Sequence, residues 1–167
     1  MTQYIIIRGP LGIGKSTIAH KLASAINGYV VCVDSILAEQ GLDQVPEGAE
    51  CIPAESFLKV NELVINDVRE KLEGGTSVIF DGNFYHKDVL DNLVGMLEKK
   101  GYSGKVFTLK APVELCIERD SGRKKPHGKW AAIAVHNLVN RFDYGVSVDV
   151  VGKSAEDIVK EIKNHLN

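Results

Sequence analysis

The chain has 167 residues, of which 44% are hydrophobic and 25% charged, and its net charge is −2. This is the composition of one ordinary globular domain, long enough to bury a core without disulfides or a structural metal. The slight acidity argues against a broad basic surface for nucleic acid or membranes. Three cysteines without a CxxC pair indicate reduced thiols, and no signal or membrane-spanning segment opens the chain. We therefore expect a single cytoplasmic domain over residues 1–167.

Strand-like and helix-like segments alternate along the whole chain. Five short apolar runs predict buried strands: Tyr4–Arg8, Tyr29–Asp34, Ser77–Asp81, Lys105–Lys110 and Val146–Val150. Apolar residues three and four apart predict helices between them, over Ser16–Ile26, Phe57–Leu72, Val89–Leu97 and Val135–Phe142. Ser154 and Asp157 form a capping-box pair before the last helix. This alternation predicts an α/β fold with a parallel sheet covered on both faces.

Two long segments match no regular element. One, Gln40–Ile52, is rich in glycine, proline and acid, and the other, Ser121–Lys129, reads SGRKKPHGK. Long irregular segments in a compact domain are often lids or binding loops. We therefore expect both segments to border a functional site.

The residues RGPLGIGKST, from Arg8 to Thr17, match the phosphate-loop pattern G-x-x-x-x-G-K-[ST]. Glycines let consecutive backbone N–H groups wrap around an anion, and the following helix adds its N-terminal N–H groups. Lys15 would span the β- and γ-phosphates, and the Ser16 hydroxyl would bind Mg²⁺. The motif follows a predicted strand and opens a predicted helix, which is the context it requires. It predicts nucleoside triphosphate binding by Gly9, Gly12, Ile13, Gly14, Lys15, Ser16 and Thr17.

Two carboxylates follow predicted strands. Asp81 ends the strand VIF, at the sheet edge where such folds bind ligands, and could hold Mg²⁺. Alternatively, it only stabilises the Asp-Gly-Asn turn. Asp34 ends VVCVD and could be the general base that accepts a proton from an acceptor hydroxyl. The alternative for Asp34 is the N-cap of a short helix from Ser35 to Glu39.

A basic stretch follows the fourth predicted strand. Arg119 and Arg123 are four residues apart, which on one helix would place both guanidinium groups on the same face. Arginine is suited to stabilise the charge of a phosphoryl group in transfer. The alternative is a solvated basic helix end that matches the helix dipole. Beside a phosphate loop, the stretch is better interpreted as a lid over about residues 119–130.

Taken in order, the motifs GPLGIGKST, VVCVD, VIFDGNFY and LKAPVELCIERDSGR resemble the small P-loop kinases, whose sheet is of the nucleoside-monophosphate-kinase type. The group includes gluconate kinase, chloramphenicol phosphotransferase, zeta toxins and polynucleotide 5′-kinase. The resemblance implies a three-layer fold with a five-strand parallel sheet in the order 2-3-1-4-5 and a short lid. It further implies that Asp34 faces the acceptor, that Asn83 touches it, and that Arg119 and Arg123 approach the ATP phosphates.

Several residues depart from the family pattern or remain open. The lid carries Lys124 and Lys125 where some relatives have further arginines, and the acceptor-side segment, about residues 38–60, has no recognisable substrate signature. Arg8 is unexpectedly bulky and charged, so we expect it to pair with an acid. Trp130 is interpreted as a packing residue rather than a base-stacking one.

The sequence thus predicts a Mg²⁺- and ATP-dependent kinase that transfers the γ-phosphoryl group to a hydroxyl of a small-molecule or nucleotide-type acceptor. Lys15, Asp34, Arg119 and Arg123 would be catalytic, Asp34 and Asn83 would contact acceptor, and Ser16 and Asp81 would bind the metal. A polynucleotide 5′-kinase and a slowly hydrolysing nucleotide switch are the alternatives, although the chain has no guanine-reading NKxD-like motif. No membrane partner is expected, nucleic acid is not favoured, and either a monomer or a homodimer fits.

Overall fold

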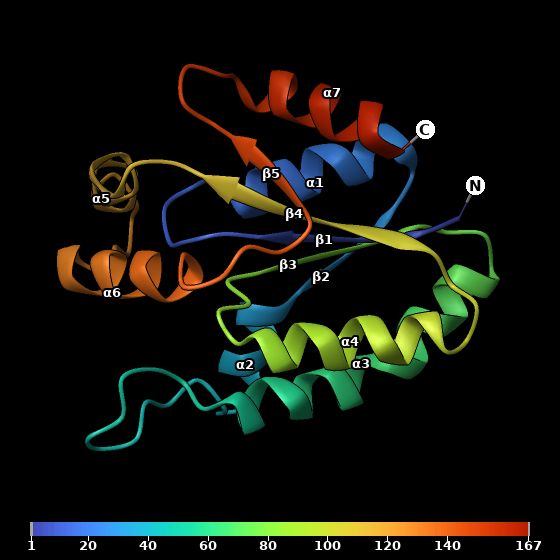
Figure 1. Ribbon diagram of the computed structural model, residues 1–167, viewed down its shortest axis with the longest axis horizontal. Coiled ribbons are helices and arrows are strands. Elements are labelled where there is room, and N and C mark those ends of the chain that lie inside the picture. The colour runs from blue at the N-terminus through green and yellow to red at the C-terminus, as the bar shows by residue number, and fades with distance from the viewer. Residues whose placement is uncertain (1, 167) are drawn as a thin grey trace.

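A five-stranded parallel sheet in the order β2-β3-β1-β4-β5 forms the centre of this computed structural model, which describes residues 2–166 (Figure 1). The strands are β1 (Tyr4–Arg8), β2 (Tyr29–Cys32), β3 (Val78–Gly82), β4 (Gly104–Lys110) and β5 (Val146–Asp149). The expected fold class and strand order are both confirmed. The carboxyl ends of the strands all lie at one end of the sheet, because every pairing is parallel.

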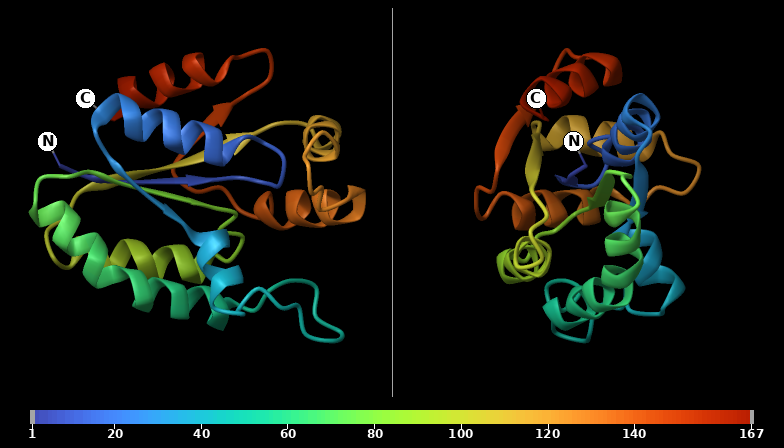
Figure 2. Two further views of the ribbon diagram at one scale, coloured as in Figure 1. Left: turned by 180° about the vertical axis from the view of Figure 1, so that it is seen from behind. Right: turned by 90° about the vertical axis from the view of Figure 1, so that its right-hand side faces the viewer.

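Seven helices connect and cover the strands within residues 2–166: α1 (Lys15–Ile26), α2 (Val33–Glu39), α3 (Ala54–Glu73), α4 (Lys87–Glu98), α5 (Val113–Ser121), α6 (Lys129–Val139) and α7 (Ala155–Leu166). Helices α1 and α7 pack on one face of the sheet, and α3 and α4 pack on the other (Figures 1 and 2). Helices α5 and α6 pack against each other at the carboxyl end of the strands. In the described part of the chain, no helix is both long and apolar enough to cross a membrane.

The central strand β1 contributes to both hydrophobic cores. Ile5 and Ile7 are fully buried among residues of α1 and α7, whereas Tyr4 and Ile6 are buried among residues of α3 and α4. Successive side chains of a strand point to opposite faces of the sheet, so a run without polar positions requires cover on both faces. The strand therefore specifies the three-layer arrangement.

Several predicted element boundaries need correction. β2 ends at Cys32, so Asp34 lies in the first turn of α2 and not at the end of the strand, and Cys32 takes the N-cap position. Helix α5 ends at Ser121, so Arg119 and Arg123 do not share a helix face. Asp120, in the last turn of α5, accepts hydrogen bonds from the loop that follows the helix. The capping box is confirmed, since the Ser154 hydroxyl accepts from the Asp157 N–H at 3.1 Å.

The two irregular segments are also confirmed. Residues 40–53 contain no helix or strand and project from the body of the molecule on the side of α5 and α6 (Figures 1 and 2). Residues 122–128 form the second loop, between α5 and α6. Both loops therefore stand at the end of the sheet where the strands finish.

Two leucines provide a matched test of this packing. Leu93 in α4 is fully buried in the core, whereas Leu63 in α3 is 56% exposed. We expect Leu93→Ala to lower the free energy of unfolding by about 2 to 5 kcal/mol, because it leaves a cavity. Leu63→Ala should change it by about 0.5 kcal/mol or less. Urea denaturation followed by circular dichroism measures both, and equal losses would contradict the assigned burial.

Candidate functional site

Three neighbouring strands end at the same level and bring the candidate residues together. In the register of the sheet, Ile7 of β1 and Cys32 of β2 both lie beside Asp81 of β3. The phosphate loop leaves β1 immediately after this level, and α2 with Asp34 leaves β2. Residues that are far apart in the sequence thus converge because parallel strands share one carboxyl edge.

The phosphate loop has the backbone geometry that its glycines predict. Gly12 and Gly14 have φ angles of 78° and 101°, in the left-handed region that side chains disfavour. A Cβ atom on Gly12 would lie 2.3 Å from the carbonyl oxygen of Cys116 in α5. Helix α1 begins at Lys15, directly after this turn, and Gly14 provides no capping side chain. The first N–H groups of α1 are therefore available to an anion.

Lys15 is buried at the base of the loop, with 7% of its surface exposed. Its ammonium group donates to the carbonyl of Pro10 at 2.9 Å. Burial lowers the pKa of Lys15, while the carboxylates of Asp34 and Asp81 raise it and the guanidinium of Arg123 lowers it further. The side chains of Asp34, Asp81 and Arg123 are thus close enough to Lys15 to shift its pKa.

Ser16 and Asp81 are in direct contact. The Ser16 hydroxyl donates to Asp81 Oδ2 at 2.6 Å. The other carboxylate oxygen, Oδ1, is buried and has no hydrogen-bond partner among the described residues. A hydroxyl beside a carboxylate with a free oxygen is a donor set that suits Mg²⁺, a hard cation that keeps other positions for water and phosphate. The residues therefore fit the ion that the sequence predicts.

Asp34 faces the same space from the first turn of α2. Burial raises its pKa, and the negative charge of Asp81 adds to this rise. The ammonium of Lys15, the backbone N–H of Asn83 and the ring of His127 act in the opposite direction. A carboxylate whose proton affinity is increased by burial is a better base than an exposed one at neutral pH, provided it remains ionised.

Asn83 lies two residues after Asp81, and its side chain is 8% exposed. Its amide oxygen Oδ1 is buried without a hydrogen-bond partner in the described structure. Phe84, the next residue, has a φ angle of 47°, which is strained for a bulky side chain. Such an unsatisfied acceptor beside a strained turn is expected at a binding site rather than in a packing core.

The two lid arginines occupy different positions. Arg119 donates from Nη1 to the carbonyl of Ile13 in the phosphate loop at 3.0 Å. Arg123 lies in the loop after α5, with Nη1 3.4 Å from His127 Nδ1. The lid therefore reaches the phosphate loop through Arg119 and the surroundings of Lys15 through Arg123.

Sequence reasoning missed Asp120, which organises the lid. Its carboxylate is 1% exposed and accepts from the backbone N–H groups of His127, at 3.2 Å, and Gly128, at 2.9 Å. The His127 ring nitrogen Nδ1 lies 3.1 Å from the same carboxylate. Burial opposes ionisation of Asp120, but these hydrogen bonds outweigh it, so its pKa lies below the ordinary value. No sequence spacing signals these bonds, because they form across an irregular loop.

Arg8 does not form the ion pair that we expected. It is fully buried, and its guanidinium donates to Thr108 Oγ1 at 3.1 Å and to the Val139 carbonyl at 2.7 Å, and lies 4.3 Å from the centre of the Phe142 ring. Burial lowers the pKa of Arg8 to about 10. Val139 ends α6, so Arg8 joins the start of the phosphate loop to the helix that follows the lid. Its charge is balanced by carbonyl dipoles at that helix end.

The structure also places Trp130 and the remaining phosphate-loop residues. Trp130 is 78% exposed at the start of α6, so its interpretation as a packing residue is wrong. Of the remaining phosphate-loop residues, Ile13 is buried against Gly9, and Thr17 is exposed in the first turn of α1. Thr17 is therefore accessible beside Ser16.

Comparison with known proteins agrees with this geometry. The AAA domain family model matches residues 5–142 of the chain. The chain belongs to the AAA domain family. A protein of Pyrococcus furiosus named "Putative adenylate kinase" is 25% identical over 173 residues, covering 98% of this chain and 83% of the relative.

Solved structures share the fold over nearly the whole chain. The APS kinase of Mycobacterium tuberculosis, in complex with AMPPNP and APS, has a TM-score of 0.75 at 16% identity, covering 99% of this chain and 97% of that one. A sugar kinase from Janibacter has a TM-score of 0.74 at 17% identity, covering 99% and 95%. The tunicamycin resistance protein of Deinococcus radiodurans has a TM-score of 0.71 at 21% identity, covering 100% and 96%. The expected resemblance to small P-loop kinases is confirmed.

Two glycines separate backbone strain from the contact with α5. Gly12 and Gly48 have φ angles of 78° and 76°, but a Cβ on Gly48 would meet nothing within 4 Å. Gly48→Ala should therefore lower the free energy of unfolding only by the strain of the left-handed conformation, about 1 to 2 kcal/mol. Gly12→Ala should lower the free energy of unfolding several times more than Gly48→Ala does. It should also abolish ATP binding, because the added methyl group collides with the backbone of Cys116. Urea unfolding and ATP titration measure both effects, and equal behaviour of the two variants would contradict the contact.

Proposed function

We propose that the protein is an ATP-dependent phosphotransferase that moves the γ-phosphoryl group of ATP to a hydroxyl group of its acceptor. The observation that carries this proposal is the convergence of two carboxylates and Lys15 at the mouth of a phosphate loop. A nucleotide-binding switch would need no second carboxylate beside the loop. The family match and the kinase fold of the structural relatives support the same activity.

The donor half of the site would bind the triphosphate. The phosphate-loop N–H groups and the N-terminus of α1 would hold the β- and γ-phosphates, and Lys15 would leave the Pro10 carbonyl to bind them. Ser16 and Asp81 would hold Mg²⁺, which neutralises phosphate charge when bound. Arg123, already near Lys15, would stabilise charge on the transferring group.

The acceptor half would activate the hydroxyl. Asp34 accepts the hydroxyl proton as the acceptor oxygen forms a bond to the γ-phosphorus and the bond to the bridging oxygen of ADP breaks. The backbone N–H of Asn83 lowers the pKa of Asp34 and so favours its ionised form. Most of the catalysis would come from positioning and electrostatics, because phosphoryl transfer requires little covalent help from the protein.

Asp34→Asn tests the proposed base. We expect kcat to fall about 100- to 10,000-fold, because the amide cannot accept the proton, while the Kd for ATP stays within about twofold. In the unmodified protein, kcat/KM should fall with decreasing pH in a limb above the ordinary aspartate pKa of about 3.9, since the raised pKa of Asp34 protonates the base sooner. A coupled ADP-release assay at a series of pH values measures kcat and kcat/KM. Titration with labelled ATP measures the Kd.

The matched control for Asp34→Asn is Asp67→Asn, at an exposed position of α3 outside the acceptor-side segment. It should retain at least about half of kcat. Transfer that survives Asp34→Asn unchanged would refute the proposed base. Hydrolysis of ATP without transfer to any acceptor would favour the switch instead.

Ser16→Ala and Asp81→Asn test the metal assignment. Each should raise the Mg²⁺ concentration needed for half-maximal ATP binding about tenfold or more, because each removes a ligand or its support. In the double variant, the loss of binding free energy should be smaller than the sum of the two single losses, since both residues would bind one ion. Fluorescence titration with a labelled ATP analogue, repeated in EDTA, is the measurement. Equal losses with and without Mg²⁺ would contradict the assignment.

A further inference from the structure

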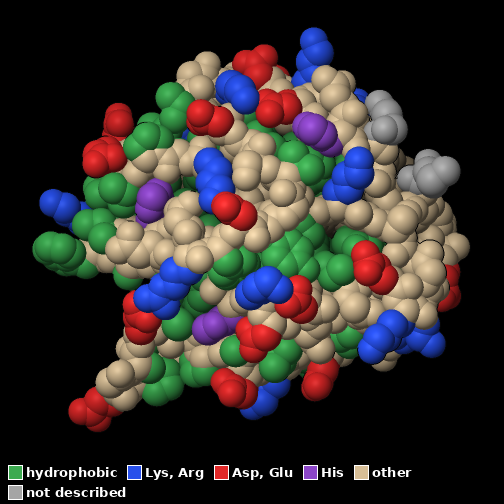
Figure 3. All heavy atoms as spheres, viewed as in Figure 1, with side chains coloured by type: hydrophobic (Ala, Val, Ile, Leu, Met, Phe, Trp, Pro, Cys, Tyr) green, Lys and Arg blue, Asp and Glu red, His purple; other side chains and the backbone are tan. Residues whose placement is uncertain are grey.

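The two loops that flank the site carry opposite charge. The lid, residues 119–130, contains a single acid, Asp120, against five cations: Arg119, Arg123, Lys124, Lys125 and Lys129. The acceptor-side segment, residues 38–60, contains a single cation, Lys59, against five acids: Glu39, Asp43, Glu47, Glu50 and Glu55. These five acids are all exposed, and Figure 3 shows acidic side chains at the tip of the projecting loop, at the lower left. The positive charge is thus concentrated on the donor side of the site.

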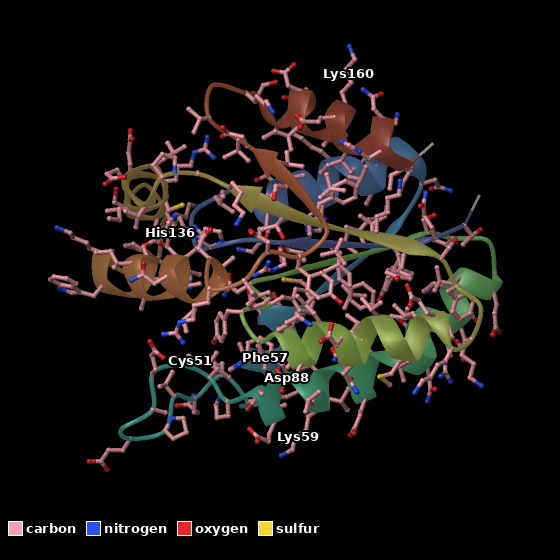
Figure 4. All side chains as sticks on the ribbon, viewed as in Figure 1. Cys51, Phe57, Lys59, Asp88, His136 and Lys160 are labelled. Atoms are coloured by element: carbon pink, nitrogen blue, oxygen red, sulfur yellow. The ribbon has the colours of Figure 1, made fainter. Side chains whose placement is uncertain are left out.

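The lone cation of the acceptor-side segment points away from the site. Lys59 is exposed on α3 and lines a surface groove with Glu62 and Gln40. In Figure 4 its side chain extends from the outer side of α3, away from the sheet. Lys59 therefore cannot neutralise an anion beside Asp34.

One arginine reaches this segment from elsewhere, and it is already paired. Arg141, just after α6, donates from Nη2 to the carboxylate of Glu50. This ion pair joins the acceptor-side segment to the residues that follow α6. It also cancels the charge of the arginine, so Arg141 would have to leave Glu50 before it could bind an acidic acceptor.

The end of the same segment is anchored beside the proposed base. The Ile52 carbonyl lies 2.8 Å from His86 Nε2, and the backbone of Ile52 is close enough to the Tyr85 hydroxyl to oppose part of the rise in its pKa. The Tyr85 hydroxyl is close enough to Asp34 for its pKa to be raised by that carboxylate, in addition to the larger effect of burial. The acidic segment therefore adjoins the acceptor side of the site and is not a remote surface.

An aromatic cluster makes this anchorage rigid. The ring centre of Phe57 lies 5.3 Å from that of Tyr85 and 5.6 Å from that of His86, and the latter two rings are 5.0 Å apart, all edge to face. Cys51 packs against the hydrophobic cluster that contains Phe57, and both residues are labelled in Figure 4. The cluster fixes where the loop returns to the core.

Two acceptor groups lie at this end of the site. Asp34 presents a carboxylate, and Asn83 presents a buried amide oxygen that has no partner among the described residues. Such oxygens bind hydroxyl and ammonium donors, whereas a phosphate or carboxylate on the acceptor would be repelled and would lose water without compensation. An anionic acceptor would need a cation here, and residues 38–60 provide none that faces the site.

From these contacts we infer that the acceptor is an uncharged or positively charged hydroxyl compound, not a nucleotide, a sugar acid or another anion. The inference rests on the proposed function, since it concerns the second substrate of that reaction. It also means that AMP, the acceptor of an adenylate kinase, is not the acceptor expected for this chain, despite the name of its Pyrococcus relative.

Equilibrium binding tests the inference without requiring transfer. With the donor site saturated by AMPPNP and Mg²⁺, calorimetric titration compares two matched series: adenosine against AMP, and glucose or glucosamine against gluconate. We expect an uncharged or cationic member to bind at least about tenfold more tightly than its anionic counterpart, which is about 1.4 kcal/mol. Tighter binding of AMP or gluconate would overturn the inference, and so would the absence of binding by every uncharged and cationic probe.

Charge variants show whether the acceptor-side segment is responsible. The double variant Asp43→Asn, Glu47→Gln should weaken glucosamine binding about threefold or more and narrow the preference against gluconate. The double variant Asp67→Asn, Glu70→Gln, which removes the same number of charges from exposed positions of α3, should alter neither. Identical effects of the two variants would overturn the role of the segment. The transfer assay remains separate, so a correct binding preference without transfer would refute the proposed function and leave the charge preference intact.

Discussion

The close approach of the phosphate loop to helix α5 is the constraint on which the site depends. Gly12 passes the Cys116 carbonyl at a distance that excludes any side chain, and Arg119 from the same helix donates to the Ile13 carbonyl. Helix α5 continues directly into the lid, whose loop is closed by Asp120. The conformation of the loop and the position of the lid are therefore coupled, and Arg8 adds a second link from β1 to the end of α6.

Groups of opposite charge lie on opposite sides of the proposed transfer site. The triphosphate requires several positive groups, which the phosphate loop and lid concentrate on the donor side. A carboxylate base would be repelled by the same phosphates, but Lys15 lies close enough to Asp34 and Asp81 to offset part of that repulsion. Beyond Asp34 the surface becomes acidic, and the paired Arg141 adds no net charge there. In the proposed reaction, charge would therefore distinguish the two substrates before any specific contact does.

The residues that sequence reasoning singled out share one property, which is that a local pattern in the chain marks them. The glycines, Lys15 and Ser16 form a continuous motif, and Asp81 lies near the end of a strongly apolar strand. The two residues that it misjudged, Arg8 and Trp130, depend on how distant parts of the chain meet. Arg8 donates to residues at least 100 positions away, and Trp130 is exposed because the lid leaves the start of α6 uncovered.

The sequence by itself determined the α/β class, the phosphate loop and the order of the motifs, because hydrophobic period and glycine geometry act over a few residues. Only the tertiary structure decided that Asp34 belongs to a helix, that Arg119 and Arg123 contact different partners, and that Asp120 holds the lid. It also decided that Lys59 points outward and that Arg141 is paired with Glu50. These outcomes depend on which surfaces meet when the chain folds, and hydrogen bonds across irregular loops leave no periodic pattern in the sequence.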